Sequence, residues 1–132
     1  MKIESFEDLE IWQAARSVCK LIYLKSSEDS FKKDFDLVRQ IRRSSGSCMD
    51  NIAEGFERGG NKELIQFLFI AKGSIGETRS QLSRALDLKY ISKDDFDQLK
   101  EECLMISKKI SGFIKYLKNS EFKGTKYHSG ES

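Results

Sequence analysis

The sequence predicts an all-α protein, folded as an antiparallel up-down-up-down four-helix bundle. Pro is absent and charged residues make up 33% of the 132 residues, a composition that favours long uninterrupted helices. Four segments carry apolar residues at alternating spacings of three and four, and the connections between them are short, which makes neighbouring helices antiparallel. We therefore expect one domain, a four-helix bundle over residues 1–118.

The first two helices are predicted over residues 6–25 and 34–58. Ser5 followed by Asp8 resembles a capping box at the first helix start. The first helix has four apolar positions at helical spacing: Ile11, Ala15, Val18 and Ile22. The second helix is expected to turn one face to the core: Leu37, Val38, Ile41, Ser45, Cys48, Ile52 and Phe56. The polar segment between the two helices is read as a connection.

The third helix is predicted over residues 61–89. Gly59 and Gly60 stop the second helix, because glycine accepts the left-handed conformation of a helix C-terminus, and Asn61 is expected to cap the third. Its core positions alternate at spacings of four and three: Leu64, Leu68, Ala71, Ile75, Thr78, Leu82 and Ala85.

The fourth helix is predicted over residues 92–118, with Ser92 and Asp95 as its cap. Its core positions form a heptad seam: Phe96, Leu99, Cys103, Ile106, Ile110, Phe113 and Leu117. Acidic residues come early and lysines late, which complements the helix dipole. Residues 119–132 show no apolar period and are expected to form a disordered tail.

Charge and cysteine content limit the function classes. The net charge is only +2, so an anionic partner would have to meet a local basic patch. Cys19, Cys48 and Cys103 are odd in number and lie at or beside apolar positions, so buried reduced thiols are expected. No signal peptide and no apolar run of roughly 20 residues is found, which predicts a cytoplasmic protein.

A second stripe on the helix over 34–58 has the period of a core seam but is polar throughout: Gln40, Arg43, Ser47, Asn51, Glu54 and Arg58. One interpretation is a solvated surface with pairs such as Glu54 to Arg58. Another is a buried or interfacial polar network. The run Ser44 to Ser47 contains poor helix formers, which favours close passage of another helix or a ligand.

The helix over 61–89 is apolar nearly all round in its first part, residues 64–71. Gly73 and Gly76 lie mid-helix, where each costs about 1 kcal/mol relative to Ala. Ile65 and Phe69 either flank the core or belong to an interface between copies of the chain. The second interpretation predicts a homo-oligomer.

Three stretches carry a family resemblance: "FEDLEIWQAA", "QIRRSSGSCMDNIAEGF", and "FLFIAKGSIGETRSQL" followed by "YIS". They resemble the four-helix-bundle proteins encoded in intervening sequences of 23S ribosomal RNA genes. The resemblance covers roughly residues 5–118, and its most specific segments are N-I-A-E-G at 51–55 and A-x-G-S-x-x-E at 71–77.

The resemblance implies a left-handed bundle that closes into a homopentameric ring with a poorly defined biochemical role. The family is similar to the accessory protein of diversity-generating retroelements, a bundle that binds nucleic acid and works beside a reverse transcriptase. The positions that match the family's polar signature are Gln40, Arg43, Ser47, Asn51, Glu54, Gly55, Arg58, Gly73, Ser74 and Glu77. No catalytic role is attached to them.

Enzymatic classes are disfavoured. A ferritin-like di-iron site needs two Glu-x-x-His motifs, and the only histidine is His128. No phosphate-binding glycine loop or hydrolase motif is present, so we expect no catalytic residue, metal or cofactor. A carboxylate pair from Glu54 and Glu77 is conceivable, but these acids are expected to neutralise Arg43 and Arg58.

Two functional hypotheses follow. In the first, an oligomer binds RNA or another nucleic acid through phosphate contacts from six cations: Arg39, Arg42, Lys62, Lys72, Arg79 and Arg84. The alternative is a ring that acts as a protein-interaction scaffold, with these cations as ordinary surface. Aromatic stacking motifs are not visible in the sequence, which counts against sequence-specific recognition.

Overall fold

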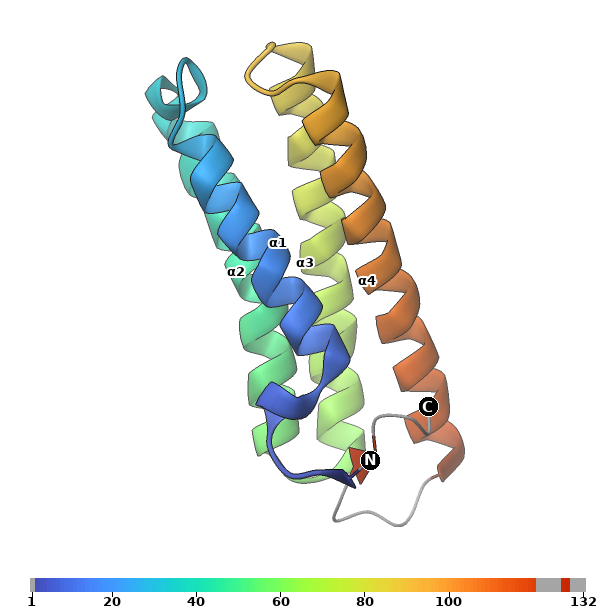
Figure 1. The fold of residues 1–132 in the computed structure, drawn as a ribbon. Helices are drawn as coiled ribbons and strands as arrows, with labels where there is room; N and C mark the ends of the chain where they lie inside the picture. The colour runs from blue at the N-terminus through green and yellow to red at the C-terminus, as the bar shows by residue number, and fades with distance from the viewer. Residues whose placement is uncertain (1, 121–126, 129–132) are drawn as a thin grey trace.

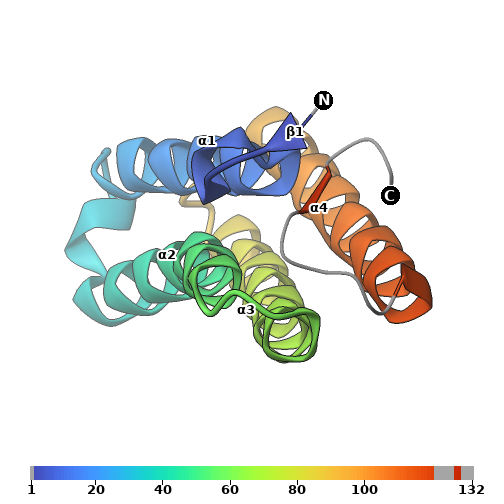
Figure 2. The same cartoon turned by 90° about the horizontal axis from the view of Figure 1, so that it is seen from below.

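The computed structural model describes residues 2–120 and 127–128 and shows four long helices packed in chain order as an antiparallel bundle (Figure 1). The helices are α1 (Glu10–Ser26), α2 (Phe35–Glu57), α3 (Asn61–Asp87) and α4 (Lys93–Ser120). Seen from below, they follow one another around the core (Figure 2). Among helices that neighbour each other around the core, the contact between α2 and α3 is the most extensive and that between α1 and α4 the least. Within the described residues, no helix is long and apolar enough to cross a membrane.

The core contains the predicted stripes. Every predicted core position of α1, α3 and α4 is buried, whereas Val38 and Phe56 of α2 are half-buried at its edge. Cys48 and Cys103 are buried free thiols, and burial raises the pKa of each to about 12. They are therefore uncharged at neutral pH and act as small core residues. Cys19 is free but only half-buried.

The start of α1 differs from the prediction. Ser5 and Asp8 do form a cap, with the Asp8 carboxylate accepting from the backbone N–H groups of Glu4 at 3.1 Å and Ser5 at 3.2 Å. That cap closes a separate 3-10 turn, η1 (Phe6–Asp8). Leu9 is extended and buried, so it interrupts the helical conformation, and α1 begins only at Glu10.

The predicted cap of α3 is wrong, and that of α4 is confirmed. Gly60 occupies the N-cap position of α3 and Asn61 is its first helical residue. The Asn61 amide instead donates to the Leu117 carbonyl oxygen at 3.4 Å, which joins α3 to α4. Ser92 caps α4 as predicted, because its hydroxyl accepts from the Asp95 N–H at 3.0 Å.

The boundary between α4 and the tail also moves. α4 continues through Asn119 to Ser120, two residues that we expected in the tail. Further along, strand β2 (Tyr127–His128) pairs antiparallel with strand β1 (Lys2–Ile3). The remaining tail positions lie outside the described residues, so their predicted disorder stays a prediction.

The connection between α1 and α2 contacts the connection between α3 and α4 at the upper end of the bundle in Figure 1. Phe31 of the 3-10 helix η2 (Phe31–Lys33) is buried, and its ring stacks on Tyr90 with 5.2 Å between centroids. The Tyr90 hydroxyl donates to the Asp34 carboxylate at 2.9 Å. This cluster joins the residues before α2 to those after α3.

Candidate nucleic-acid interface

The middle of the polar region of α2 is a buried seam against α3. The Ser44 hydroxyl donates to Gln81 Oε1 at 2.6 Å and lies 2.7 Å from the Thr78 hydroxyl. A second contact joins the Ser47 and Ser74 hydroxyls at 2.9 Å. Small hydroxyl side chains let the two helices approach closely, and each hydroxyl supplies a hydrogen-bond partner for another buried polar group. Packing within the bundle therefore explains Ser44 and Ser47 of the run of poor helix formers that suggested a ligand.

Gly55 marks a close approach of the same two helices. A Cβ at this position would lie 2.6 Å from the Phe67 Cβ and 3.1 Å from a Leu64 methyl carbon. Only glycine fits without a shift of the helices. This signature position therefore has a packing role inside one chain.

Other residues of the predicted polar stripe lie outside this buried seam. Glu54 and Arg58 form an exposed ion pair of 2.7 Å, and Arg58 also lies 5.0 Å from the Phe67 ring centroid. Asn51 donates only within its own helix, to the Ser47 carbonyl at 2.8 Å and hydroxyl at 3.0 Å. Arg43 is exposed and makes no hydrogen bond or ion pair among the described residues. The stripe is thus not one continuous network.

The two acids considered as a carboxylate pair have separate partners. Glu54 pairs with Arg58, as expected, but Glu77 accepts from the Gln81 amide at 3.4 Å. Arg43 has neither acid as an ion-pair partner. Among the described residues, no group of three or more His, Cys, Asp or Glu side chains could hold a metal ion.

The six cations predicted to bind phosphate do not form one patch. Arg42 is held against α1, donating to the Ser26 and Ser27 hydroxyls at 2.9 Å each, with its guanidinium 4.5 Å from the Tyr23 ring centroid. On the same helix, Arg39 pairs with Asp36 at 3.4 Å on the surface. These two side chains have partners already.

The four cations of α3 are spread along its length. Arg84 donates to the Gln40 amide oxygen at 3.1 Å, on the α2 side. Lys62 is exposed, Lys72 and Arg79 are half-buried, and none of the three makes an ion pair among the described residues. They remain available for an anionic partner.

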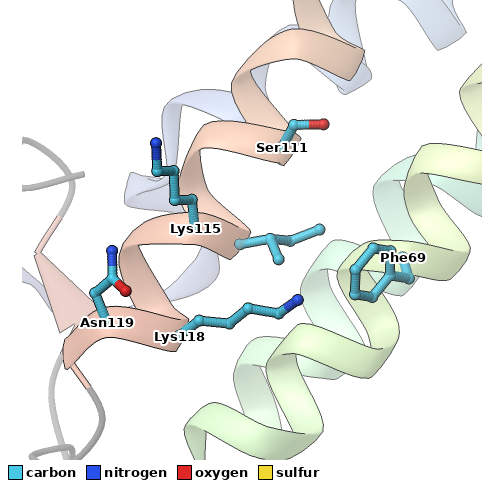
Figure 3. A pocket seen from close by; sticks show the side chains of 6 residues that line it. Phe69, Ser111, Lys115, Lys118 and Asn119 are labelled. Atoms are coloured by element: carbon cyan, nitrogen blue, oxygen red, sulfur yellow. The ribbon is translucent and has the colours of Figure 1, made fainter.

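A groove between α3 and α4 brings together residues that the sequence interpretation missed (Figure 3). It has a volume of about 330 Å³ and is lined by Phe69, Ser111, Ile114, Lys115, Lys118 and Asn119. Phe69 is 51% exposed, and Lys118 extends from α4 to place its Nζ 5.3 Å from the Phe69 ring centroid. Lys115 also lines the groove, although its side chain points away from Phe69.

A sequence signal for this groove existed. Residues 104–120 contain lysines and no acidic residue, a pattern that we interpreted only as complementing the helix dipole. Exposed aromatic rings beside unpaired ammonium groups are typical of surfaces that bind single-stranded nucleic acid, because bases stack on the rings while the cations contact phosphates.

Residues 7–112 match the sequence profile of a family described as 23S rRNA-intervening sequence protein. The chain belongs to this family. The match includes the two most specific segments of the resemblance, 51–55 and 71–77.

Among solved structures, this 23S rRNA-intervening sequence family member is similar to a crystal structure from Bacteroides thetaiotaomicron VPI-5482. That structure is described as a protein with unknown function from the S23 ribosomal protein family. The two chains are 23% identical with a TM-score of 0.73, and the match covers 80% of this chain and 98% of that chain. At this identity the similarity concerns the fold. No curated protein matches the chain.

Proposed function

We propose that this chain is a cytoplasmic, non-catalytic protein that binds RNA as a homo-oligomer. The observation that carries the proposal is the groove between α3 and α4, where the exposed Phe69 ring lies beside Lys118. The family's name, which refers to 23S rRNA intervening sequences, makes RNA the nucleic acid to test first.

The charge around the groove supports phosphate binding. Lys115 and Lys118 make no ion pair within the described part of the chain, whereas Lys109 on the α1 side of α4 pairs with Glu10 at 3.2 Å. With a net charge of only +2, the chain can attract an anionic partner only through a local basic patch. The groove supplies such a patch. Contacts of this kind do not discriminate between sequences.

Self-association is supported by the outer face of α3. Ile70 is 51% exposed, and a Cβ at Gly73 or Gly76 would meet nothing within 4 Å. The fold of one chain therefore does not require either glycine, although each costs about 1 kcal/mol relative to Ala. A second copy that packs here accounts for both features, and the family resemblance makes the expected oligomer a homopentamer. A ring repeats the groove, so weak contacts combine through effective concentration.

The test is fluorescence anisotropy with labelled RNAs of increasing length at several salt concentrations. For single strands the slope of log K against log salt is about −0.7 for each phosphate neutralised. Lys115→Gln with Lys118→Gln should flatten this slope. Phe69→Ala should lower affinity by about 1 kcal/mol or more, the contribution of one stacked base.

The matched control is Lys32→Gln with Lys33→Gln, which removes two exposed lysines of η2 at the other end of the bundle. This variant should keep the salt slope of the unmodified protein. No binding at low salt would reject the RNA proposal and leave the protein-interaction scaffold. An unchanged slope in the Lys115 and Lys118 variant would show that RNA uses another face.

A further inference from the structure

A second hollow, of about 440 Å³, lies on the outer face of α2 beside α1. It is lined by Tyr23, Arg42, Arg43, Gly46, Ser47, Asp50 and Asn51. Neither the packing of the bundle nor the groove between α3 and α4 uses these residues together. Their chemistry differs from that of the groove, because a carboxylate is present beside the cations.

One wall of the hollow is formed by an arginine held over an aromatic ring. The Arg42 guanidinium lies 4.5 Å from the Tyr23 ring centroid, and two serine hydroxyls accept its N–H groups at 2.9 Å each. Tyr23 is 47% exposed. Aromatic rings and guanidinium planes are the surfaces on which proteins stack unpaired RNA bases. This pair is 19 residues apart in sequence, so the sequence alone did not show it.

Gly46 lies in the middle of α2 and keeps the hollow open. A Cβ at Gly46 would meet nothing within 4 Å, whereas a Cβ at Gly55 of the same helix would lie 2.6 Å from the Phe67 Cβ. Packing within the chain thus explains Gly55 but not Gly46. A planar group that approaches the helix backbone does explain it.

The hollow also holds one unused donor group and one unused acceptor group. Arg43 and Asp50 are both exposed, and neither makes a hydrogen bond or ion pair within the described residues. They are two turns apart on α2, about 10 Å along its axis. A ligand that fits them presents acceptors to a guanidinium and donors to a carboxylate.

Guanine has both sets of groups. Its O6 and N7 accept from arginine in the commonest specific base contact, and its N1–H and 2-amino groups can donate together to a carboxylate. Adenine lacks the O6 acceptor and the N1–H donor. We propose that this hollow binds a guanine base of single-stranded RNA, stacked on the Tyr23–Arg42 pair with Arg43 and Asp50 at its edges.

The inference rests on the proposed RNA binding and adds a base preference to it. The first experiment compares RNAs of one length, each oligouridine with a single central G, A or inosine. We expect the G-containing RNA to bind about fivefold or more tightly than the A-containing RNA, the discrimination of one good bidentate contact. Inosine lacks the 2-amino group and should fall between them.

Variants then locate the preference. Gly46→Leu fills the hollow and should abolish the preference for G while the salt slope persists. Asp50→Asn removes the carboxylate but keeps Arg43, so it should reduce this preference and remove the difference between G and inosine. The control is Glu57→Leu, which adds the same side chain at an exposed position of the same helix. A melting curve for each variant shows that it is folded, and light scattering shows that its oligomer is unchanged.

Crosslinking identifies the contact directly. RNA with a single 6-thioguanosine, irradiated with near-ultraviolet light, should attach to Tyr23 or to residues 43–50, as mapped by mass spectrometry. Salt-dependent binding without a G preference, or crosslinks only in the groove between α3 and α4, overturns the inference but not the proposed function. A smaller oligomer in Gly46→Leu identifies the hollow as a contact between copies and overturns it as well. No RNA binding at all rejects both.

Discussion

Individual polar residues of this bundle have very different surroundings despite similar positions in the sequence pattern. Ser47 of the predicted polar stripe is hydrogen-bonded to Ser74 between α2 and α3, whereas Glu54 of the same stripe is half exposed with a partner one turn away. The neighbouring Ser44 and Thr78 hydroxyls are fully buried between the two helices. A buried hydroxyl that loses its partner keeps its desolvation penalty, while an exposed ion pair is worth little.

Thr78→Val should therefore destabilise the fold by about 1–3 kcal/mol, because it leaves the Ser44 hydroxyl and the Ser74 carbonyl oxygen with one partner fewer. Urea unfolding measures the change. The control is Ser83→Ala, which removes an exposed hydroxyl of the same helix and should change stability by less than about 0.5 kcal/mol. An equal loss of unfolding free energy in both variants would show that the buried hydroxyl contacts between α2 and α3 do not stabilise the fold.

Gly55→Ala should destabilise the fold by about 1–3 kcal/mol, because its Cβ would overlap the Phe67 Cβ and force α2 away from α3. The matched variant is Gly112→Ala on α4, where a Cβ would meet nothing within 4 Å. That change should stabilise the helix by up to about 1 kcal/mol. Opposite shifts in melting temperature are the expected result.

At the scale of whole elements, local signals marked the helices but not always their ends. The Ser92 cap was predicted from residues within one turn, and it is present. Asn61 carried a similar local signal, yet its side chain contacts α4, which is 56 residues away in sequence. A side chain that can cap its own helix can also bond a neighbouring one, and only the packing decides between the two.

The start of α2 should be sensitive to acid. The backbone N–H of Leu37 and then the Tyr90 hydroxyl, both bonded to Asp34, lower the pKa of its carboxyl below the ordinary 3.8. A lowered folded-state pKa contributes stability above the unfolded pKa, which is lost as pH falls through the folded value.

Asp34→Ala should therefore lower the melting temperature at pH 7 by removing the cap of α2. The difference from the unmodified protein should shrink as pH falls below the ordinary aspartate pKa. Tyr90→Phe removes one of the two hydrogen bonds and should give a smaller change in the same direction. A difference that is constant with pH would show that the carboxylate charge is not involved.

At the scale of the whole molecule, one chain leaves large apolar side chains in water. Ile70 on α3 is 51% exposed beside a glycine with open space above it, which is the basis for proposing a homo-oligomer. Light scattering coupled to size exclusion should show several copies, and Ile70→Asp should reduce their number. The control is Leu88→Asp, which changes a residue that is 52% exposed at the other end of α3. A monomer at micromolar concentration would contradict the proposal.

The sequence by itself determined the helices, the core and the family. Each core stripe repeats every three to four residues, and that period depends only on the geometry of one helix. Because every helix presents such a stripe, the four stripes could be predicted without knowing how the helices face one another.

Only the tertiary structure decided which polar and charged residues are free to act. Arg42 and Lys118 look equivalent in the sequence, yet Arg42 is bonded to serines of α1 and its connection, and Lys118 reaches over an exposed ring of α3. Their partners come from other elements, so no local period contains them. The candidate binding surfaces therefore appear only when α1 meets α2 and α3 meets α4.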